Sequence, residues 1–257
     1  MSRYDAMFRR CGNAGVFGAF VMLGDPDLET CAEILDQLVE GGADMIEVGI
    51  PFSDPIADGP VIQAAAVRAL ANGTTPADCF ALLRDFRGRH PGVPVGILTY
   101  ANLVLARGRG DFYARAAQAG VDSVLVADVP VLEAAPYATA ARAQGIAPVL
   151  IASANTPPHR LVEIAQLGGG YTYCVARAGV TGADQDAHFD HRAMLDGLRE
   201  AGAPPPIFGF GISRPDQVRA ALAAGAAGVI SGSAIVVRIA RGEDVTGFVR
   251  EMKAATL

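Results

Sequence analysis

A glycine followed within a few residues by an apolar run recurs along the chain and constrains its fold more than any other feature. It is visible in the segments VEGGADMIEVGI, AQAGVDSVLVAD and LAAGAAGVISGS. In each segment an amphipathic helical pattern ends at the glycine, which favours the left-handed cap conformation, and a strand follows. The strand segments are almost continuously apolar, as is typical of a parallel sheet buried on both faces.

Roughly eight such strands alternate with helical patterns. We expect them near Val16, Met45, Val95, Ser123, Ala147, Tyr171, Ile207 and Gly228. In a chain of 257 residues this count predicts the α/β class, as a (β/α)8 TIM barrel with a short N-terminal helix and a single domain over residues 1–257. An open doubly wound sheet is the alternative, but the even spacing and the lack of an early GxGxxG motif favour the barrel.

Composition argues against several classes of protein. The net charge of -6 argues against a nucleic-acid surface, because phosphate backbones require a basic patch. No apolar run reaches membrane-spanning length, and the N-terminal segment lacks the apolar core of a signal peptide. The four cysteines are scattered and include no CxxC pair, which is typical of reduced thiols. We therefore expect a cytoplasmic protein that binds neither nucleic acid nor membrane.

The segment MIEVGIPFSDPIADGP, residues 45–60, places Glu47 inside an apolar strand and further acids on the loop that follows. Barrel active sites lie at the C-terminal ends of strands, so this loop and Asp128 after the fourth strand belong to the predicted mouth. Prolines stiffen the loop and hold Asp58 in place at low entropic cost. The role of Asp54 on the same loop is more ambiguous. Desolvation should raise the pKa of Glu47, while Asp58 should stay ionised. Such a pair can divide acid and base roles.

Each of these side chains also has a structural interpretation. Glu47 could pair with a buried polar group, and Asp58 could cap the helix that begins near Pro60. Tyr171 and Tyr173 lie on one strand, and we expect only one of them to face the barrel interior.

The ends of the seventh and eighth strands predict an anion site. Their sequences, GFGIS and SGSA, supply Gly209, Gly211, Gly232 and Ser233 where the next helices begin. Barrels often bind phosphate at these two loops, against the amides of a helix N-terminus. Glycine permits close approach, so no basic side chain is needed. Turn formation and helix–strand packing are the alternative role, but the joint position of these residues favours a phosphorylated small-molecule substrate.

The sequence lacks suitably placed residues for two common mechanisms, covalent catalysis by lysine and catalysis by a histidine-bound metal ion. The sole lysine, Lys253, lies near the C-terminus and not at a strand end, which argues against a Schiff base and against lysine-bound pyridoxal phosphate. The histidines His90, His159, His188 and His191 lie in or beside helical patterns, so a histidine-built metal site is not expected. Carboxylates therefore remain as the reactive groups at the mouth.

Beyond these patterns, EVGIPFSDPIADGP resembles the signature of the tryptophan synthase alpha subunit family. The segments GAFVMLGDP, YANLV, GVDSVLVADVP, GYTYCVARAGVTG, GFGISRPDQV, AGAAGVISGSAIV and MKAAT resemble the same family in the same order and span essentially the whole chain. The resemblance implies a carbon–carbon lyase without cofactor or metal, which cleaves indole-3-glycerol phosphate to indole and glyceraldehyde 3-phosphate in tryptophan biosynthesis. In that family's terms, Glu47 is the general acid/base, and Asp58 accepts the indole N–H and stabilises the positive charge on the ring.

The resemblance also implies binding roles. Phosphate would rest on the amides of Gly182, Gly211, Gly232 and Ser233. The indole pocket would be lined by Phe20, Leu98, Leu125, Tyr173 and Phe210, although Phe20 and Phe210 could also be plain core residues. Thr181, in a lid at Ala178–Ala187, would close towards Asp58.

A partner is implied as well. The family's alpha subunit docks on a pyridoxal-phosphate beta subunit in an alpha-beta-beta-alpha tetramer and passes indole to it. By motif, the docking face would be the rim of the mouth, at Pro51, Asp54, Asn102 and Pro130. These are proline or polar positions on loops, where a rigid barrel presents function.

The chain departs from the family pattern at three places around the mouth. Met22 stands where threonine is usual, Ala176 replaces a frequent serine, and the Ser153–Thr156 loop lacks the usual Pro-Thr or Pro-Asn. Two alternatives therefore stay open: a free-standing indole-3-glycerol phosphate lyase that releases indole for another pathway, and a catalytically weak barrel that activates a beta-type partner. The intact pair of Glu47 and Asp58 argues against the second.

Overall fold

In the part of the chain that the structure describes, nine parallel strands form one continuous sheet. The computed structural model describes residues 1–175, 191–209 and 211–257. The strands are β1 (Val16–Met22), β2 (Met45–Gly49), β3 (Val95–Thr99), β4 (Ser123–Val126), β5 (Ala147–Pro148), β6 (Leu150–Ser153), β7 (Thr172–Val175), β8 (Pro206–Phe208) and β9 (Gly228–Ser231).

The sheet closes into a barrel through one short segment. β5 and β6 stand at the two ends of the strand order, yet only Val149 separates them along the chain. β5 pairs with β4 and β6 pairs with β7, and the Val149 amide donates to the Val124 carbonyl at 3.0 Å. β5 and β6 together are the fifth predicted strand, so the prediction of a (β/α)8 barrel is confirmed.

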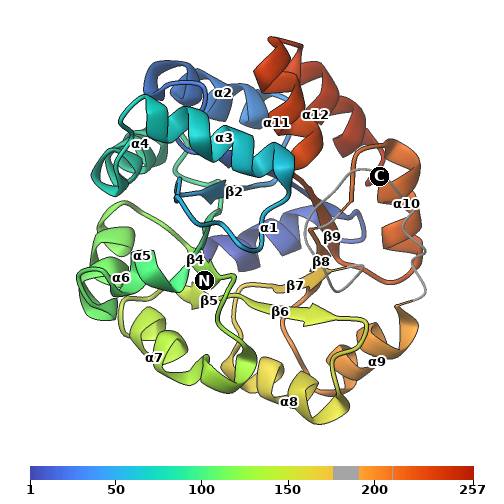
Figure 1. The fold of residues 1–257 in the computed structure, drawn as a ribbon. Coiled ribbons are helices and arrows are strands. Elements are labelled where there is room, and N and C mark those ends of the chain that lie inside the picture. Colours follow the sequence, from blue (N-terminus) through green and yellow to red (C-terminus); the bar gives the residue numbers. More distant parts are fainter. Residues whose placement is uncertain (176–190, 210) are drawn as a thin grey trace.

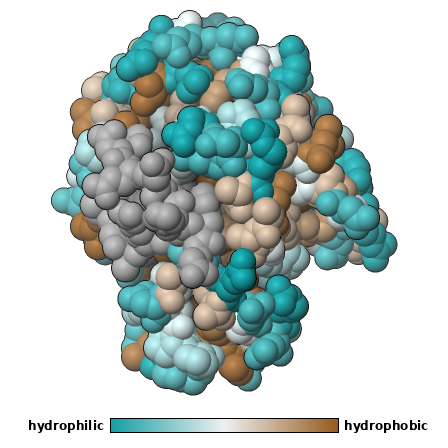
Figure 2. Space-filling view, turned by 90° about the vertical axis from the view of Figure 1, so that its right-hand side faces the viewer, coloured by the Kyte–Doolittle hydropathy of each residue, from teal (hydrophilic) through white to brown (hydrophobic). Residues whose placement is uncertain are grey.

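Helices α2 to α12 form an outer ring around the strands, and α1 lies across one end of the barrel (Figure 1). The helices are α1 (Arg3–Cys11), α2 (Leu28–Glu40), α3 (Pro60–Ala71), α4 (Pro76–Arg89), α5 (Ala101–Leu105), α6 (Arg109–Gln118), α7 (Ala135–Ala143), α8 (Pro158–Leu167), α9 (Arg192–Glu200), α10 (Pro215–Ala223), α11 (Ser233–Arg241) and α12 (Val245–Ala254), with a 3-10 turn η1 (Val131–Glu133). The side of the ring that carries α10 is mostly hydrophilic, with hydrophobic residues in small groups (Figure 2).

The alternation of side chains along β1 divides the core into two layers. Phe17, Ala19 and Val21 pack in the layer between the sheet and the helices. Phe20 and Met22 pack in the layer inside the barrel. Every residue of β1 is buried, which explains why the strand is apolar throughout instead of alternating with polar residues.

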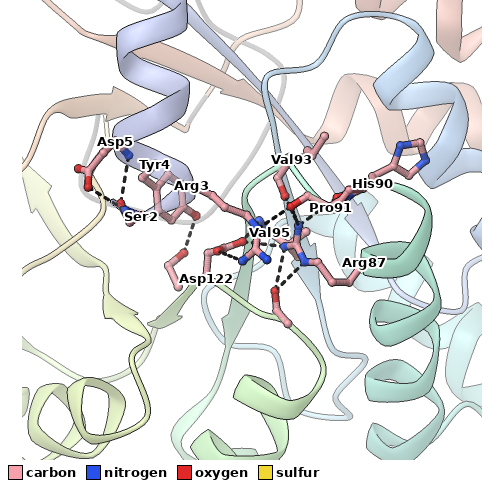
Figure 3. Close-up of polar contacts among 12 residues, drawn as sticks. Ser2, Arg3, Tyr4, Asp5, Arg87, His90, Pro91, Val93, Val95 and Asp122 are labelled. Carbon is pink, nitrogen blue, oxygen red and sulfur yellow. Dashed lines mark hydrogen bonds and ion pairs between the residues drawn. The ribbon is translucent and has the colours of Figure 1, made fainter.

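The predicted N-terminal helix, α1, closes the N-terminal end of the barrel. Tyr4 is buried, and its hydroxyl lies 2.7 Å from Oγ of Ser123 at the start of β4. Next to it, Arg3 and Arg87 converge on the Asp122 carboxylate at 2.8 and 2.7 Å (Figure 3). The helix is therefore anchored to the end of the barrel opposite the strand C-termini.

Arg87 of α4 organises the backbone at this closed end. Its guanidinium donates to the Gly120 carbonyl at 2.8 and 3.0 Å and to the Val93 carbonyl at 2.7 Å. The Asp122 oxygen that it contacts also accepts the Val95 amide at 2.8 Å. One side chain thus joins the segments that lead into β3 and β4.

No helix in the described ranges is long and apolar enough to cross a membrane. The four cysteines are free, and Cys31, Cys79 and Cys174 are buried. Burial raises the pKa of Cys31 to about 11, so this thiol is poorly nucleophilic near neutral pH.

Candidate active site

Glu47 projects from the middle of β2 into the barrel. It is 1% exposed, and the Tyr171 hydroxyl donates a 2.6 Å hydrogen bond to its Oε1. Its Oε2 is buried and has no hydrogen-bond partner among the described residues. Burial raises the pKa of Glu47 to about 7, and the Tyr171 hydrogen bond opposes this with a smaller effect. The predicted desolvation of Glu47 is confirmed, and its carboxyl can gain or lose a proton near neutral pH.

Asp58 reaches the same end of the barrel from the loop between β2 and α3. Although it lies on a loop, it is only 7% exposed, and burial raises its pKa to about 6. The carboxyl is therefore still mostly ionised at pH 7. Asp58 does not cap α3, whose N-cap residue is Gly59 and which has no side-chain capping bond. The helix-cap interpretation of Asp58 is thereby removed.

Tyr100, directly after β3, braces the loop that carries Asp58. Its ring stacks on Phe52, with ring centroids 5.4 Å apart. Its hydroxyl accepts the Ala57 amide at 3.3 Å and hydrogen-bonds to Asp58, which lowers the pKa of that carboxyl. Tyr100 thus holds both ends of the loop. Sequence reasoning missed this residue, although its position at a strand end was a signal that could have found it.

A cavity of about 250 Å³ lies at the mouth of the barrel. Its apolar wall includes the predicted residues Phe20, Leu98 and Tyr173 beside Asp58, together with Val61, Ile62 and Ile230, which the sequence did not single out. Leu125, the other described residue of the predicted indole pocket, is buried in the adjoining interior layer and not on this wall. The structure therefore brings most of the described apolar pocket residues together around Asp58.

Glu47 lies beside this cavity and not on its wall. Its register partner on the neighbouring strand β1 is Phe20, which does line the cavity, so Glu47 lies one strand away from the wall. Its carboxylate accepts the hydrogen bond of the Tyr171 hydroxyl. A side-chain rotation would be needed for the carboxyl to reach a ligand in the cavity.

Tyr171 and Tyr173 both face the barrel interior. Tyr171 contacts Glu47, and Tyr173 lines the cavity and donates to the Gly209 carbonyl at 2.7 Å. The expectation that only one would face inward was wrong, because residues two apart on a strand share a face. The Gly209 amide donates to the Cys174 carbonyl at 3.1 Å, so its predicted exposure to an anion was also wrong.

The other end of the cavity carries the predicted anion-binding residues. Gly211, Gly232 and Ser233 line it, and α11 begins at Ser233 with Gly232 as its N-cap residue. No side chain caps this helix. The Ile235 amide donates to the Gly232 carbonyl at 2.9 Å, but amides at the very start of a helix have no partner within it, so those of Gly232 and Ser233 are available to a ligand. The Ser231 hydroxyl donates to the Ile212 carbonyl at 2.7 Å and holds the loop after β8 against the end of β9.

Several predicted residues lie outside the described part of the chain. They are Thr181, Gly182 and Phe210, together with the Ala178–Ala187 lid and Ala176. Their proposed roles therefore rest on the sequence.

The predicted docking rim is mostly exposed. Asp54, Asn102 and Pro130 lie at the surface on the segments that follow β2, β3 and β4. Pro51 is buried, so its side chain does not belong to this face. The same segments expose large hydrophobic side chains that sequence reasoning missed: Ile56 at 71%, Leu105 at 45% and Leu132 at 64%. These side chains offer apolar area to a partner that docks on the rim.

Other titratable groups near the predicted sites have structural partners. Asp128 accepts the Ala101 amide at 2.7 Å, at the start of α5. Lys253 pairs at 2.7 Å with Asp44, which precedes β2, so the lysine lies at the barrel end opposite the mouth. The described residues include no group of three His, Cys, Asp or Glu side chains that could hold a metal ion.

Two of the departures from the family pattern can be placed. Met22 is buried in the interior layer, not on the cavity wall, and a Cβ added at Gly49 would lie 2.8 Å from its terminal methyl group. In the loop after β6, the Ser153 amide donates to Thr156 Oγ1 at 2.9 Å and the Ser153 hydroxyl donates to Asn155 at 2.7 Å. These bonds close the loop without the usual proline.

The sequence matches the model of the family described as "Tryptophan synthase alpha chain" over residues 9–256. Among curated relatives, the tryptophan synthase alpha chain of Shewanella amazonensis is 53% identical, and the match covers 100% of both chains. That of Cronobacter sakazakii is 52% identical, over 100% of this chain and 99% of the relative.

Solved structures have the same fold. A chain of Mycobacterium tuberculosis tryptophan synthase matches with a TM-score of 0.89 and 28% identity, over 99% of this chain and 98% of that one. A chain from the tryptophan synthase a2b2 complex of Pyrococcus furiosus matches with a TM-score of 0.84 and 37% identity, over 93% of this chain and 98% of that one.

Proposed function

The chain belongs to the tryptophan synthase alpha chain family, and we propose that Glu47 and Asp58 carry out its reaction. This reaction cleaves indole-3-glycerol phosphate to indole and glyceraldehyde 3-phosphate. One observation supports the assignment above all: Asp58 shares an apolar cavity wall with Phe20, Leu98 and Tyr173, and Glu47 lies directly beside that wall.

The two carboxyl groups divide the proton transfers. Glu47, with a pKa of about 7, begins as the acid and protonates C3 of the indole ring. Ionised Asp58 accepts a hydrogen bond from the ring N–H and stabilises the positive charge that grows on the ring. The Glu47 carboxylate then takes the proton of the glycerol hydroxyl next to the ring. The C–C bond breaks, its electron pair returns to the indole, and the aldehyde leaves.

The proton transfers balance over one catalytic cycle. Glu47 gives one proton to carbon and receives one from oxygen, so it ends in the protonated form in which it began. Its rotation away from Tyr171 towards the cavity is the motion that the reaction requires, since the carboxyl is not on the wall in this structure. No cofactor takes part in these steps.

The remaining cavity residues orient the substrate. Phe20, Leu98 and Tyr173 hold the apolar ring, with Leu125 in the adjoining interior layer. The role of Phe210 in the same pocket rests on the sequence. The phosphate rests on the amides of Gly211, Gly232 and Ser233 at the start of α11, with Gly182 adding a further amide. Thr181 closes towards Asp58 when substrate is bound.

A tryptophan synthase beta subunit is the partner of the chain in this function, as in the a2b2 complex of Pyrococcus furiosus. Its docking face comprises Asp54, Asn102 and Pro130, and we add the exposed side chains of Ile56 and Leu132. In this proposal residues 1–257 act as one catalytic domain in the cytoplasm, where free thiols stay reduced.

The test is to incubate the purified chain with indole-3-glycerol phosphate, alone and with a tryptophan synthase beta subunit. Indole and glyceraldehyde 3-phosphate should appear in equal amounts. An absence of indole under both conditions, from a chain that circular dichroism shows to be folded, would refute the proposal.

A further inference from the structure

Arg238 lies at the anion end of the cavity, although no strand-end pattern marked it. It belongs to α11, the helix whose first turn lines that end, and it lines the cavity together with Gly232 and Ser233. It also lines a neighbouring surface groove between α10 and α12. Arg238 therefore lies between the cavity and the groove.

The contacts of Arg238 hold the guanidinium beside the first turn of α11. One nitrogen donates to the Ala234 carbonyl at 3.0 Å, one turn back along the helix. The guanidinium carbon lies 3.8 Å from the centroid of the Phe248 ring on α12. Helical side chains lean towards the helix N-terminus, so a residue one turn into α11 directs its charge back to the amides of Gly232 and Ser233.

No carboxylate in the described ranges forms an ion pair with Arg238. The groove contains other charges, but Arg214 pairs with Asp216 at 3.2 Å, and Glu251 is not within ion-pair distance of Arg238. Arg219 also lines the groove but not the cavity. A half-buried guanidinium has five donors, and here one of them is used by a protein oxygen. An anion in the cavity would supply the counter-charge that the described residues do not.

We propose that Arg238 recognises the phosphate of the substrate and so sets the preference of the site for a phosphorylated, and not merely hydroxylated, side chain. This inference rests on the proposed function and refines it. The helix amides supply hydrogen bonds to any small anion, whereas Arg238 adds a full positive charge. The Phe248 ring keeps that charge in place and reduces the ordering needed on binding.

The test separates charge from packing. Arg238→Gln should weaken binding of glycerol 3-phosphate, measured by calorimetry, by about tenfold, the size expected for one charge-assisted hydrogen bond. Binding of indole, which has no phosphate, should be unchanged. In steady-state cleavage the KM should rise while kcat stays near the parent value, because the contact is made equally in the ground and transition states. Arg238→Lys should recover most of the affinity.

Two control variants exclude a purely structural role. Phe248→Leu removes the ring under the guanidinium but keeps the charge. It should lower the Tm, and it should weaken glycerol 3-phosphate binding less than Arg238→Gln does. Arg219→Gln removes the same charge from the same groove and should leave phosphate binding at the parent level. Equal affinity of the parent chain and a folded Arg238→Gln variant for glycerol 3-phosphate would show that Arg238 only joins α11 to α12. A parent chain that neither binds glycerol 3-phosphate nor forms indole would instead overturn the proposed function itself.

Discussion

The Tyr171 hydroxyl donates a 2.6 Å hydrogen bond to Oε1 of Glu47, while Oε2 of the same buried carboxylate has no partner among the described residues. One oxygen is thus held and the other is unsatisfied, although burying a carboxylate without full hydrogen bonding is costly. The consequence is a pKa of about 7 for Glu47. The site maintains a proton donor at neutral pH at the expense of folding stability.

Replacing Glu47 by glutamine should remove activity and leave the fold intact. An amide of nearly the same shape cannot exchange a proton, and general acid–base groups contribute about 10²–10⁴-fold to rate. Indole formation at saturating indole-3-glycerol phosphate measures the loss. Asp58→Asn should also be severely slowed, because an amide does not offer a negative charge to the ring. Turnover near the parent value in Glu47→Gln would overturn the assignment.

The same Glu47→Gln variant should be more stable than the parent chain at high pH. The pKa of Glu47 is raised from 4.5 to about 7 on folding, so the folded state binds more protons than the unfolded state between these values. Stability of the parent chain therefore falls as pH rises through this window, by up to about 3 kcal/mol. Urea unfolding at pH 5 and pH 8 measures the effect. An identical pH dependence in both chains would contradict it.

The pH profile of kcat/KM should be bell-shaped between the two carboxyl groups. Activity needs ionised Asp58, with a pKa of about 6, and protonated Glu47, with a pKa of about 7, so it falls on both sides of this range. Tyr171→Phe should move the alkaline limb to higher pH, because the lost hydrogen bond favours ionised Glu47. Tyr100→Phe should move the acid limb to higher pH, because the lost bond favours ionised Asp58. If both variants moved the same limb of the profile, Glu47 and Asp58 would not have separate roles.

How far the sequence predicted this arrangement depends on the kind of signal. Apolar strands and glycine caps repeat with the barrel units, so the strand count was available from periodicity. The burial of Glu47 followed from its apolar neighbours on one strand. These are local patterns, and local patterns are what a single sequence carries most clearly.

The errors came from contacts between distant segments. Tyr100 contacts the Asp58 loop across a long stretch of chain, so its position at a strand end could mark the residue but not this contact. The Gly209 amide was expected to face an anion, but the parallel ladder uses it for the Cys174 carbonyl. Arg238 is an ordinary helical arginine in the sequence, and its place at the cavity depends on how α11 packs.

Gly232→Val should weaken substrate binding far more than it perturbs folding. A Cβ at this position would lie 3.4 Å from the Phe20 ring, an ordinary contact, and the φ of -117° suits any residue. The branched side chain would nevertheless approach the amides that hold the phosphate. Loss of one or two charge-assisted hydrogen bonds predicts a KM higher by about tenfold to a hundredfold. Gly88→Val, in open space on α4, is the control. Equal KM values would exclude the proposed cradle.

Arg87→Ala should destabilise the closed end of the barrel and leave the catalytic residues at the mouth unaffected. The Arg87 and Asp122 side chains are 13% and 10% exposed, so removing the cation leaves the largely buried carboxylate with only Arg3 and the Val95 amide, and it takes the guanidinium from the Gly120 and Val93 carbonyls. Breaking such a pair costs about 3–5 kcal/mol. Urea unfolding measures it, against Arg199→Ala, whose exposed ion pair with Asp196 should contribute under about 1 kcal/mol. Matching midpoints for the two variants would refute this role of Arg87.

A beta subunit should stimulate cleavage of indole-3-glycerol phosphate by this chain. Indole is apolar and crosses membranes, so a partner that covers the mouth retains it. Docking on the rim would order the Asp54–Asp58 loop, a shift towards the closed state. Titration with the cognate beta subunit, with indole formation as the readout, measures the stimulation. Asp54→Ala should raise the beta concentration for half-maximal effect by about fivefold, as expected for a rim charge. Asp196→Ala, on α9 and away from the rim segments, should match the parent. High activity alone, with no response to beta, would favour a free-standing lyase, and Asp54→Ala would then be silent.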